Sequence, residues 1–278
     1  MSVQIHAPQS ALTLGIVGYG TMGKSLALGI AEKSRLARLF PILVYETYAP
    51  NAESARNAGL ALAPDMAALG AAADMIILAV KPDQMAAAVK PLLPALKPET
   101  LLISIAAGIS LDTLAALSKG RCFCARVMPN TPALVGQGIF GLCFDGNTPP
   151  PLQEAVRFLL SSLGLLIEIP EKNMNGFTAL SGSGPGYVFH FMESLAEAGV
   201  SVGLDRESSR AIASALFRGC VAMAEKGTHP AVLREQVSSP GGTTIAGLNH
   251  LDRSGVRGIL IDAVHAAARK SAEMEKGK

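Results

Sequence analysis

The feature that most constrains this chain is a glycine-rich segment that directly follows a short apolar run. Residues 14–17 form the apolar run, and Gly18, Gly20 and Gly23 follow with G-x-G-x-x-G spacing. Residues 22–31 then have the composition of a helix. In such a strand–loop–helix, the first glycine permits a tight turn and the second lets the backbone approach a pyrophosphate. The third lets the helix pack closely on the strand. The pattern predicts a dinucleotide-binding loop, with a purely structural glycine turn as the alternative.

The start of the 22–31 helix is the expected phosphate contact. A helix N-terminus offers unpaired N–H groups and the positive end of the helix dipole to anions. Thr21 and Met22 therefore join the three glycines as predicted cofactor-binding residues.

Short apolar runs alternate with Ala-rich segments up to about residue 170. The runs lie at 14–17, 42–45, 75–80, 101–105, 122–127 and 139–144. Continuous apolar runs are typical of buried parallel strands, and the segments between them are long enough for crossover helices. We predict an α/β Rossmann-type doubly wound sheet over residues 1–170.

Beyond residue 170 the strand pattern ends and apolar residues recur at helical spacing. The helical segments are expected at 172–203, 205–226 and 256–276, with Asp205 and Glu207 at a helix start. Ala and Gly are frequent there, which allows helices to pack closely. We predict an all-α dimerisation domain over residues 171–278 that buries its apolar faces against a second copy of the chain.

Residues at the ends of the predicted strands are expected to border the ligand crevice. They are Glu46, Val80, Lys81, Pro82, Ala106, Ala107, Gly108 and Asn130. A carboxylate at position 46 is typical of residues that accept hydrogen bonds from the adenosine ribose and repel a 2′-phosphate. A solvated strand-end glutamate gives the same pattern. Spacing is equally compatible with Lys81 facing the ribose or the solvent.

A second glycine-rich segment occurs late in the chain. Within residues 233–247, positions 238–244 place two serines, two glycines and two threonines just before helical residues. The free N–H groups of such a helix start form a ready carboxylate site, and an ordinary helix cap is the alternative.

Composition excludes several other classes of protein. Hydrophobic residues make up 49% and charged residues 17% of the 278 positions, so the chain is not disordered. The net charge of +2, with no basic stripe, predicts no nucleic-acid partner.

The longest apolar stretch, 101–111, is too short to span a membrane. The first ten residues lack a signal-peptide pattern. Four cysteines and five histidines show no disulfide or metal-binding spacing, so we expect no metal and a reduced, cytoplasmic protein.

Taken together, the motifs are identifiable. They are GIVGYGTMG, LAVKP, IAAG, RVMPNTP, ALSGSGPGY and LREQVSSPGGTTIAGL, in this order. The combination resembles pyrroline-5-carboxylate reductase, the last enzyme of proline biosynthesis, from about residue 12 to 275. The resemblance implies a Rossmann domain and a helical domain that forms an intertwined dimer, with dimers commonly assembling into decamers. It also implies reduction of Δ1-pyrroline-5-carboxylate to L-proline by NADPH or NADH.

The resemblance also assigns roles to particular residues. In the family, backbone N–H and hydroxyl groups of one loop hold the substrate carboxylate. The matching residues here are Ser239, Gly241, Gly242 and Thr243. Thr244 corresponds to the residue whose hydroxyl contacts the ring nitrogen, which makes it the candidate catalytic residue. Glu171 corresponds to a glutamate near the nicotinamide and the substrate, whereas the role of Gln236 stays open.

This chain departs from the family pattern at two positions. Many relatives carry Ser or Asn at the position of Glu46, and no Arg or Lys follows here until Arg56. A glutamate there predicts that NADH is used at least as well as NADPH. Gly186 replaces a commoner alanine, at some cost in local rigidity.

The expected chemistry needs little acid–base machinery, because a protonated cyclic imine is already a strong hydride acceptor. Tyr187 has Phe191 four residues on, so the Tyr-x-x-x-Lys pair of short-chain dehydrogenases is missing. Lys172 lies outside the Gly-x-x-x-Lys-x-x-x-Asn pattern of 3-hydroxyacid dehydrogenases. The alternatives are another imine or 3-hydroxyacid reductase on the same two domains, and a dinucleotide sensor without turnover.

Overall fold

The computed structural model describes residues 6–276. Residues 1–5 and 277–278, at the outer ends of the two predicted domains, lie outside the described residues. The described chain divides into two compact parts. Residues up to Gly182, together with those from Ala267 onward, form the sheet unit. Residues Ser183–Ala266 form the helical unit. The last turns of the chain thus belong to the sheet unit.

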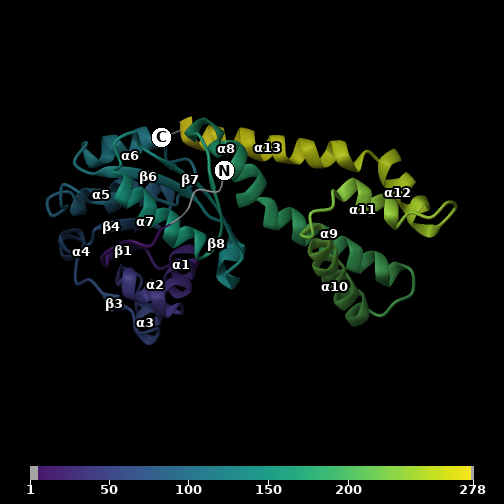
Figure 1. Ribbon diagram of the computed structural model, residues 1–278, viewed down its shortest axis with the longest axis horizontal. Coiled ribbons are helices and arrows are strands. Elements are labelled where there is room, and N and C mark those ends of the chain that lie inside the picture. The colour runs from purple at the N-terminus through teal and green to yellow at the C-terminus, as the bar shows by residue number, and fades with distance from the viewer. Residues whose placement is uncertain (1–5, 277–278) are drawn as a thin grey trace. The chain divides into compact units, whose positions relative to one another are not determined.

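The sheet unit contains eight strands within the described residues (Figure 1). They are β1 (Leu14–Val17), β2 (Ile42–Tyr45), β3 (Ala61–Leu62), β4 (Met75–Leu78), β5 (Leu101–Ser104), β6 (Phe123–Met128), β7 (Gly138–Phe144) and β8 (Gly164–Glu168). Their spatial order is β3-β2-β1-β4-β5-β6-β7-β8. β1 to β6 are parallel, with Ile16 of β1 opposite Val44 on one side and Ile77 on the other. The predicted Rossmann-type sheet is confirmed.

The apolar runs predict parallel strands throughout, but the run at 139–144 forms a strand that runs in the opposite direction. β7 pairs antiparallel with β6, with Met128 opposite Gly141, and β8 is parallel to β7. Only a short 3₁₀ turn, Thr131–Val135, lies between β6 and β7. A parallel pairing would need a crossover of a dozen or more residues, so this short connection forces the chain to reverse.

Helices cover both faces of the sheet. They are α1 (Thr21–Ala31), α2 (Ser34–Leu39), α3 (Ala49–Asn57), α4 (Met66–Ala72), α5 (Met85–Leu92), α6 (Leu111–Ser118), α7 (Pro150–Ser161) and α8 (Met174–Phe177). Buried side chains of α1, α2, α3 and α7, such as Leu26 and Leu159, form one core with Leu14 and Ile16 of β1. α4, α5 and α6 form a second core with the other face, around Leu69 and Val89. A 3₁₀ turn (Glu171–Asn173) precedes α8, and a π-helical turn (Thr178–Gly182) follows it.

The helical unit is built from a helix pair and the helices that follow. Its helices are α9 (Gly184–Ser201), α10 (Arg206–Ala224), α11 (Pro230–Gln236), α12 (Thr243–Arg253) and the first part of α13 (Val256–Lys276). The predicted start of α10 is confirmed, because the Asp205 side chain accepts a hydrogen bond from Ser208 N at 2.8 Å. A Cβ at Gly199 would lie 2.7 Å from Ser209 Oγ, so this glycine lets α9 and α10 approach closely. No helix among the described residues is long and apolar enough to cross a membrane.

Apolar side chains of the helical unit surround a pocket of about 670 Å³. Its lining residues include Tyr187, Phe191, Leu195, Phe217, Leu251, Ile259 and Leu260. We call it the apolar pocket. Several of these side chains are exposed, Ile259 to 63% and Leu260 to 41%. The helical unit therefore has a large apolar surface within its own boundaries.

Candidate active site

The glycine-rich loop has the geometry that its sequence predicts. Gly18 has φ +94°, a conformation that L side chains rarely adopt, and a Cβ there would lie 2.9 Å from Ala79 O. A Cβ at Gly23 would overlap Gly18 O, so only glycine allows α1 to pack against the loop. Gly20, by contrast, faces open space. It precedes α1 with extended backbone and no side-chain cap, which leaves the first N–H groups of the helix free for a ligand.

This loop opens into a cleft of about 700 Å³ at the carboxyl ends of β1, β2 and β4. Five of the predicted cofactor-binding residues line it: Gly18, Gly20, Glu46, Val80 and Lys81. Tyr45, Thr47, Tyr48, Asn51 and Gln84 line it as well. Parallel sheets bind nucleotides at this edge, where the strand order reverses from β1-β2 to β1-β4. The cleft thus joins residues that are up to 74 positions apart in the sequence, from Val17 to Pro91.

Glu46 is held in place by the glycine-rich loop itself. Its Oε2 accepts a hydrogen bond from Tyr19 N at 2.7 Å, and its Oε1 accepts one from Tyr48 N at 2.8 Å. Burial raises the pKa of this carboxyl, but the hydrogen bonds from the backbone of Tyr48, Tyr19 and Thr47 and from the Asn51 side chain together outweigh burial and set the pKa below its ordinary value. Glu46 is therefore an anion that both stabilises the loop and faces the cleft.

Cations are scarce in this cleft. Among the residues that line the cleft in the described part of the chain, Lys81 is the only lysine or arginine. Arg56 does not line the cleft. Lys24 donates to Ser54 Oγ at 2.9 Å, which ties α1 to α3. A negatively charged group brought next to Glu46 would thus find little compensation from the residues that line the cleft.

The remaining predicted cofactor residues of the sheet unit occupy different environments. Thr21 and Met22 lie in the first turn of α1, and Pro82 begins the 3₁₀ turn after β4. Ala106 and Gly108 are buried in the loop after β5, with Ala107 between them half-buried. Asn130 is buried and engaged by the protein, since its Nδ2 donates to Ser181 O at 3.2 Å and its Oδ1 accepts from Ile139 N at 2.9 Å.

Glu171 belongs to a polar cluster that the sequence does not reveal. Its Oε1 accepts hydrogen bonds from Leu111 N at 2.7 Å and from Arg126 Nη1 at 3.2 Å. The same Nη1 donates to Glu275 Oε1 at 2.7 Å. The Arg126 side chain is only 2% exposed. A buried arginine needs such anionic partners, but no local pattern links positions 126, 171 and 275.

The second glycine-rich segment forms a turn and a helix start within the helical unit. Gly242 N donates to Ser239 O at 3.0 Å, and Gly241 has φ +68°. α12 begins at Thr243, with extended backbone at Gly242 and no side-chain cap. Thr243 and Thr244 are exposed in the first turn of this 11-residue helix. The structure thus brings the predicted substrate residues 239–244 together at one uncapped helix N-terminus, while Glu171 lies in the sheet unit.

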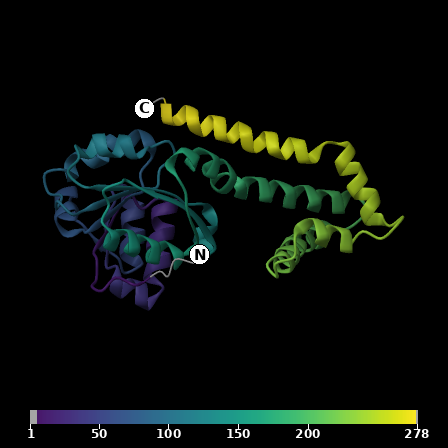
Figure 2. The same ribbon diagram turned by 45° about the horizontal axis from the view of Figure 1, so that its top comes forward.

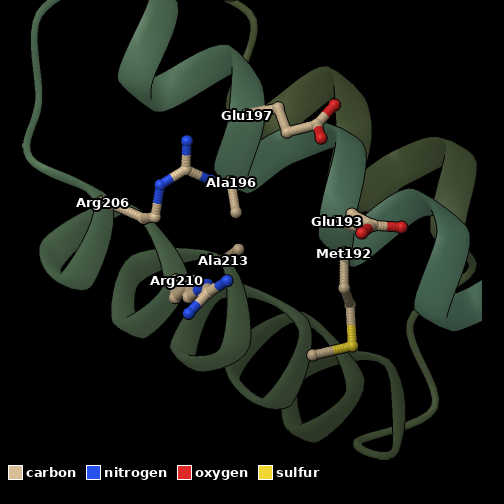
Figure 3. A pocket seen from close by; sticks show the side chains of 7 residues that line it. All are labelled: Met192, Glu193, Ala196, Glu197, Arg206, Arg210 and Ala213. Atoms are coloured by element: carbon tan, nitrogen blue, oxygen red, sulfur yellow. The ribbon is translucent and has the colours of Figure 1, made fainter.

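A group of charged side chains in the helical unit is not among the predicted site residues. A pocket of about 230 Å³ has Glu193 and Glu197 on α9 and Arg206 and Arg210 at the start of α10 among its lining residues (Figure 3). Residues 6–276 contain no cluster of three or more His, Cys, Asp or Glu side chains suited to a metal ion. Burial, reinforced by Glu171, raises the pKa of the Cys143 thiol to about 11, which keeps it protonated.

The Rossmann-type sheet, the glycine-rich loop over an open cleft and the helical unit define the class of NAD(P)-linked two-domain oxidoreductases. Family models agree with this division. Residues 13–108 match the family described as "NADP oxidoreductase coenzyme F420-dependent", and residues 171–274 match "Pyrroline-5-carboxylate reductase dimerisation".

Individual relatives narrow the class to one family. The chain is 36% identical over 263 residues to pyrroline-5-carboxylate reductase of Pisum sativum, covering 94% of this chain and 96% of the relative. The NADP-bound pyrroline carboxylate reductase of Plasmodium falciparum superposes with a TM-score of 0.83 at 34% identity, covering 97% and 100%. The Coxiella burnetii enzyme gives 0.87 at 27% identity, covering 95% and 99%. The chain belongs to the pyrroline-5-carboxylate reductase family.

Proposed function

We propose that this protein reduces Δ1-pyrroline-5-carboxylate to L-proline with NAD(P)H, the last step of proline biosynthesis. The observation that carries the proposal is the pairing of an open dinucleotide cleft with an uncapped, Ser/Gly/Thr-rich helix start in one chain. This pairing occurs in a chain that aligns with named reductases of this substrate over nearly its whole length.

The residues of the cleft suit a dinucleotide. The free N–H groups at the start of α1, beside Gly20, Thr21 and Met22, would hold the pyrophosphate. Glu46 would accept hydrogen bonds from the adenosine ribose, and Lys81 would lie along the same wall. Residues 80–82 would continue along this wall, and residues 106–108 would border the nicotinamide side. When bound, NAD(P)H supplies the hydride.

The helix start of α12 suits the substrate carboxylate. Unpaired N–H groups and hydroxyl groups of Ser239, Gly241, Gly242 and Thr243 would bind it, supported by the positive end of the α12 dipole. The Thr244 hydroxyl would hydrogen-bond the ring nitrogen as the imine becomes an amine. The imine carbon takes up the hydride and the nitrogen keeps or gains one proton, so positioning supplies most of the catalysis.

The dimerisation family match over residues 171–274 supports an oligomeric assembly. We propose a homodimer in which the exposed apolar side chains of the helical unit are covered by a second copy, and assembly of such dimers into a decamer. We further propose that the protein acts in the cytoplasm as part of amino-acid biosynthesis.

The test is the oxidation of NADH and of NADPH, followed at 340 nm with pyrroline-5-carboxylate as the acceptor. Appearance of L-proline in proportion to the cofactor consumed is the expected result. A protein that binds either cofactor but turns over none would instead be a dinucleotide sensor. Turnover only with 3-hydroxyacids would make it a dehydrogenase of another substrate class.

A further inference from the structure

The loop between β5 and α6, residues 105–110, is backed by the far end of the chain. Gly108 has φ +73°, and a Cβ there would lie 3.0 Å from the backbone oxygen of Met274 in α13. Residues 267 onward belong to the sheet unit, so this contact lies inside one compact body. Figures 1 and 2 both show the yellow end of α13 beside the sheet unit. The last turn of α13 thus rests directly on the loop.

A chain of polar contacts joins the same helix end to the other side of the loop. Glu275 Oε1 accepts from Arg126 Nη1, and Arg126 also donates to Glu171 Oε1. That same Glu171 oxygen accepts from Leu111 N, the first helical N–H group of α6, immediately after the loop. The loop is therefore fixed at Gly108 by packing and at Leu111 by a carboxylate.

A second set of contacts fixes the helix end itself. Glu275 Oε2 accepts a hydrogen bond from Asn175 Nδ2 at 2.6 Å, and Asn175 Oδ1 accepts one from Ser271 Oγ at 2.7 Å. Ser271 is buried. Two residues of α13, one turn apart, are thus tied to the same asparagine at the start of α8. Such a doubly anchored helix end has little freedom to shift away from the loop.

From these contacts we propose that the last turn of α13, through Glu275 and Arg126, positions the 105–110 loop for the cofactor. The proposal rests on the proposed function, in which Ala106, Ala107 and Gly108 border the nicotinamide side of the cleft. Arg126 is buried and both of its carboxylate partners are occupied by protein donors. These groups therefore act on the cofactor through the loop, as positioning residues.

The proposal predicts an effect on cofactor binding that outweighs the effect on the chemical step. In Glu275→Ala, Glu171 is the remaining carboxylate partner of Arg126. Because Arg126 and Leu111 N donate to the same oxygen of Glu171, a stronger pull from Arg126 weakens the hydrogen bond to Leu111 N. We expect the KM for NAD(P)H to rise about tenfold, with kcat changed less than about twofold. Glu275→Gln keeps an oxygen acceptor for Arg126 and should recover most of the wild-type KM. Glu273→Ala is the matched control, because Glu273 is exposed on the same helix and its carboxylate pairs with Lys270, at 3.3 Å, and not with Arg126.

Hydrogen exchange gives a readout without cofactor or substrate. The Leu111 amide should exchange at least about tenfold faster in Glu275→Ala and Glu171→Ala than in wild type and Glu273→Ala. Unchanged KM together with unchanged Leu111 exchange in folded Glu275→Ala would overturn the proposal. If that variant does not fold, Glu275→Asp takes its place, because the shorter side chain withdraws the carboxylate from Arg126. A KM and a Leu111 exchange rate both equal to wild type in folded Glu275→Asp would then overturn the proposal. A wild-type protein without turnover would refute the proposed function, and the exchange experiment would still decide whether α13 positions the loop.

Discussion

The sheet unit and the helical unit differ most in what they bury. In the sheet unit, β1, β4 and β5 are buried along their whole length between two helix layers. In residues 183–266, only Ser209 and Ala213 are buried, although this segment is rich in Val, Leu, Ile and Phe. The first unit therefore closes a core by itself. The second exposes more apolar surface than a monomeric protein ordinarily leaves in water, so its core is completed by association.

The largest expected effect comes from placing a charge in the apolar pocket of the helical unit. Leu260→Glu should abolish dimers and the activity that depends on them, because burying an unpaired carboxylate at an interface costs at least about 3 kcal/mol. Light scattering at micromolar concentration measures this directly. The control is Leu165→Glu on β8 of the sheet unit, at a side chain that is 58% exposed. Equal dissociation in both variants, or a wild-type protein that is a stable monomer, would show that the helical unit does not need a second copy to complete its core.

The next largest effect is expected from removing the partners of a buried charge. Among the described residues, only the sheet unit contains a buried charged side chain. Glu171→Ala combined with Glu275→Ala leaves the buried Arg126 guanidinium without a carboxylate, and we expect a loss of about 3 kcal/mol in unfolding free energy. Glu193→Ala with Glu197→Ala removes two exposed carboxylates from the helical unit and should change it by less than about 0.5 kcal/mol. Urea unfolding monitored by circular dichroism compares the two. Similar losses of unfolding free energy in the two double variants would contradict the expectation that the sheet unit depends more on its buried charges than the helical unit does.

A smaller effect is expected at the start of α12. Thr244→Ala removes one hydroxyl at the proposed ring-nitrogen contact, which should cost about 2 kcal/mol in the transition state, or roughly thirtyfold in kcat. Thr244→Ser keeps the hydroxyl and should retain most of the rate. Steady-state kinetics with saturating cofactor tests this, and an unchanged kcat in folded Thr244→Ala would remove Thr244 from the catalytic role.

The smallest expected effect lies in the cofactor cleft. Wild type should use NADH at least as well as NADPH, and Glu46→Ser should shift the ratio of kcat/KM towards NADPH by about tenfold, or 1.4 kcal/mol. Glu46→Gln can still accept a hydrogen bond from Tyr19 N or Tyr48 N but carries no charge, so a similar shift there would assign the effect to repulsion of the 2′-phosphate. A wild-type preference for NADPH of tenfold or more would contradict the argument.

Local sequence patterns predicted most of the sheet unit. The bounds of β1 and β2 agree with the apolar runs at 14–17 and 42–45, and α1 begins one residue before the expected position. β8 is not among the predicted strands. Its apolar run at 165–167 is only three residues long, and three of its five residues are exposed and none is buried, so it differs from the buried strands of the sheet interior. The reversed direction of β7 follows from a connection length, which apolar runs do not encode.

The candidate site was predictable where one short segment forms it. The glycine-rich loop and the start of α12 each depend on neighbouring residues, and their conformations follow from glycine and from helix ends. The Arg126 cluster depends on residues from four distant segments, so no spacing could indicate it. The predicted cofactor role of Asn130 stays a prediction, and its side chain already bonds Ser181 and Ile139.

The contact between Arg126 and Glu275 joins residues 149 positions apart. A ribosome makes Arg126 long before its second carboxylate, and the whole helical unit is translated in between. Domains commonly fold as they emerge during synthesis. Until Glu275 is translated, the Arg126 guanidinium of the nascent sheet unit has only one of its two carboxylate partners, Glu171. The order of translation therefore makes completion of the sheet unit a late step, taken after the helical unit has already left the ribosome.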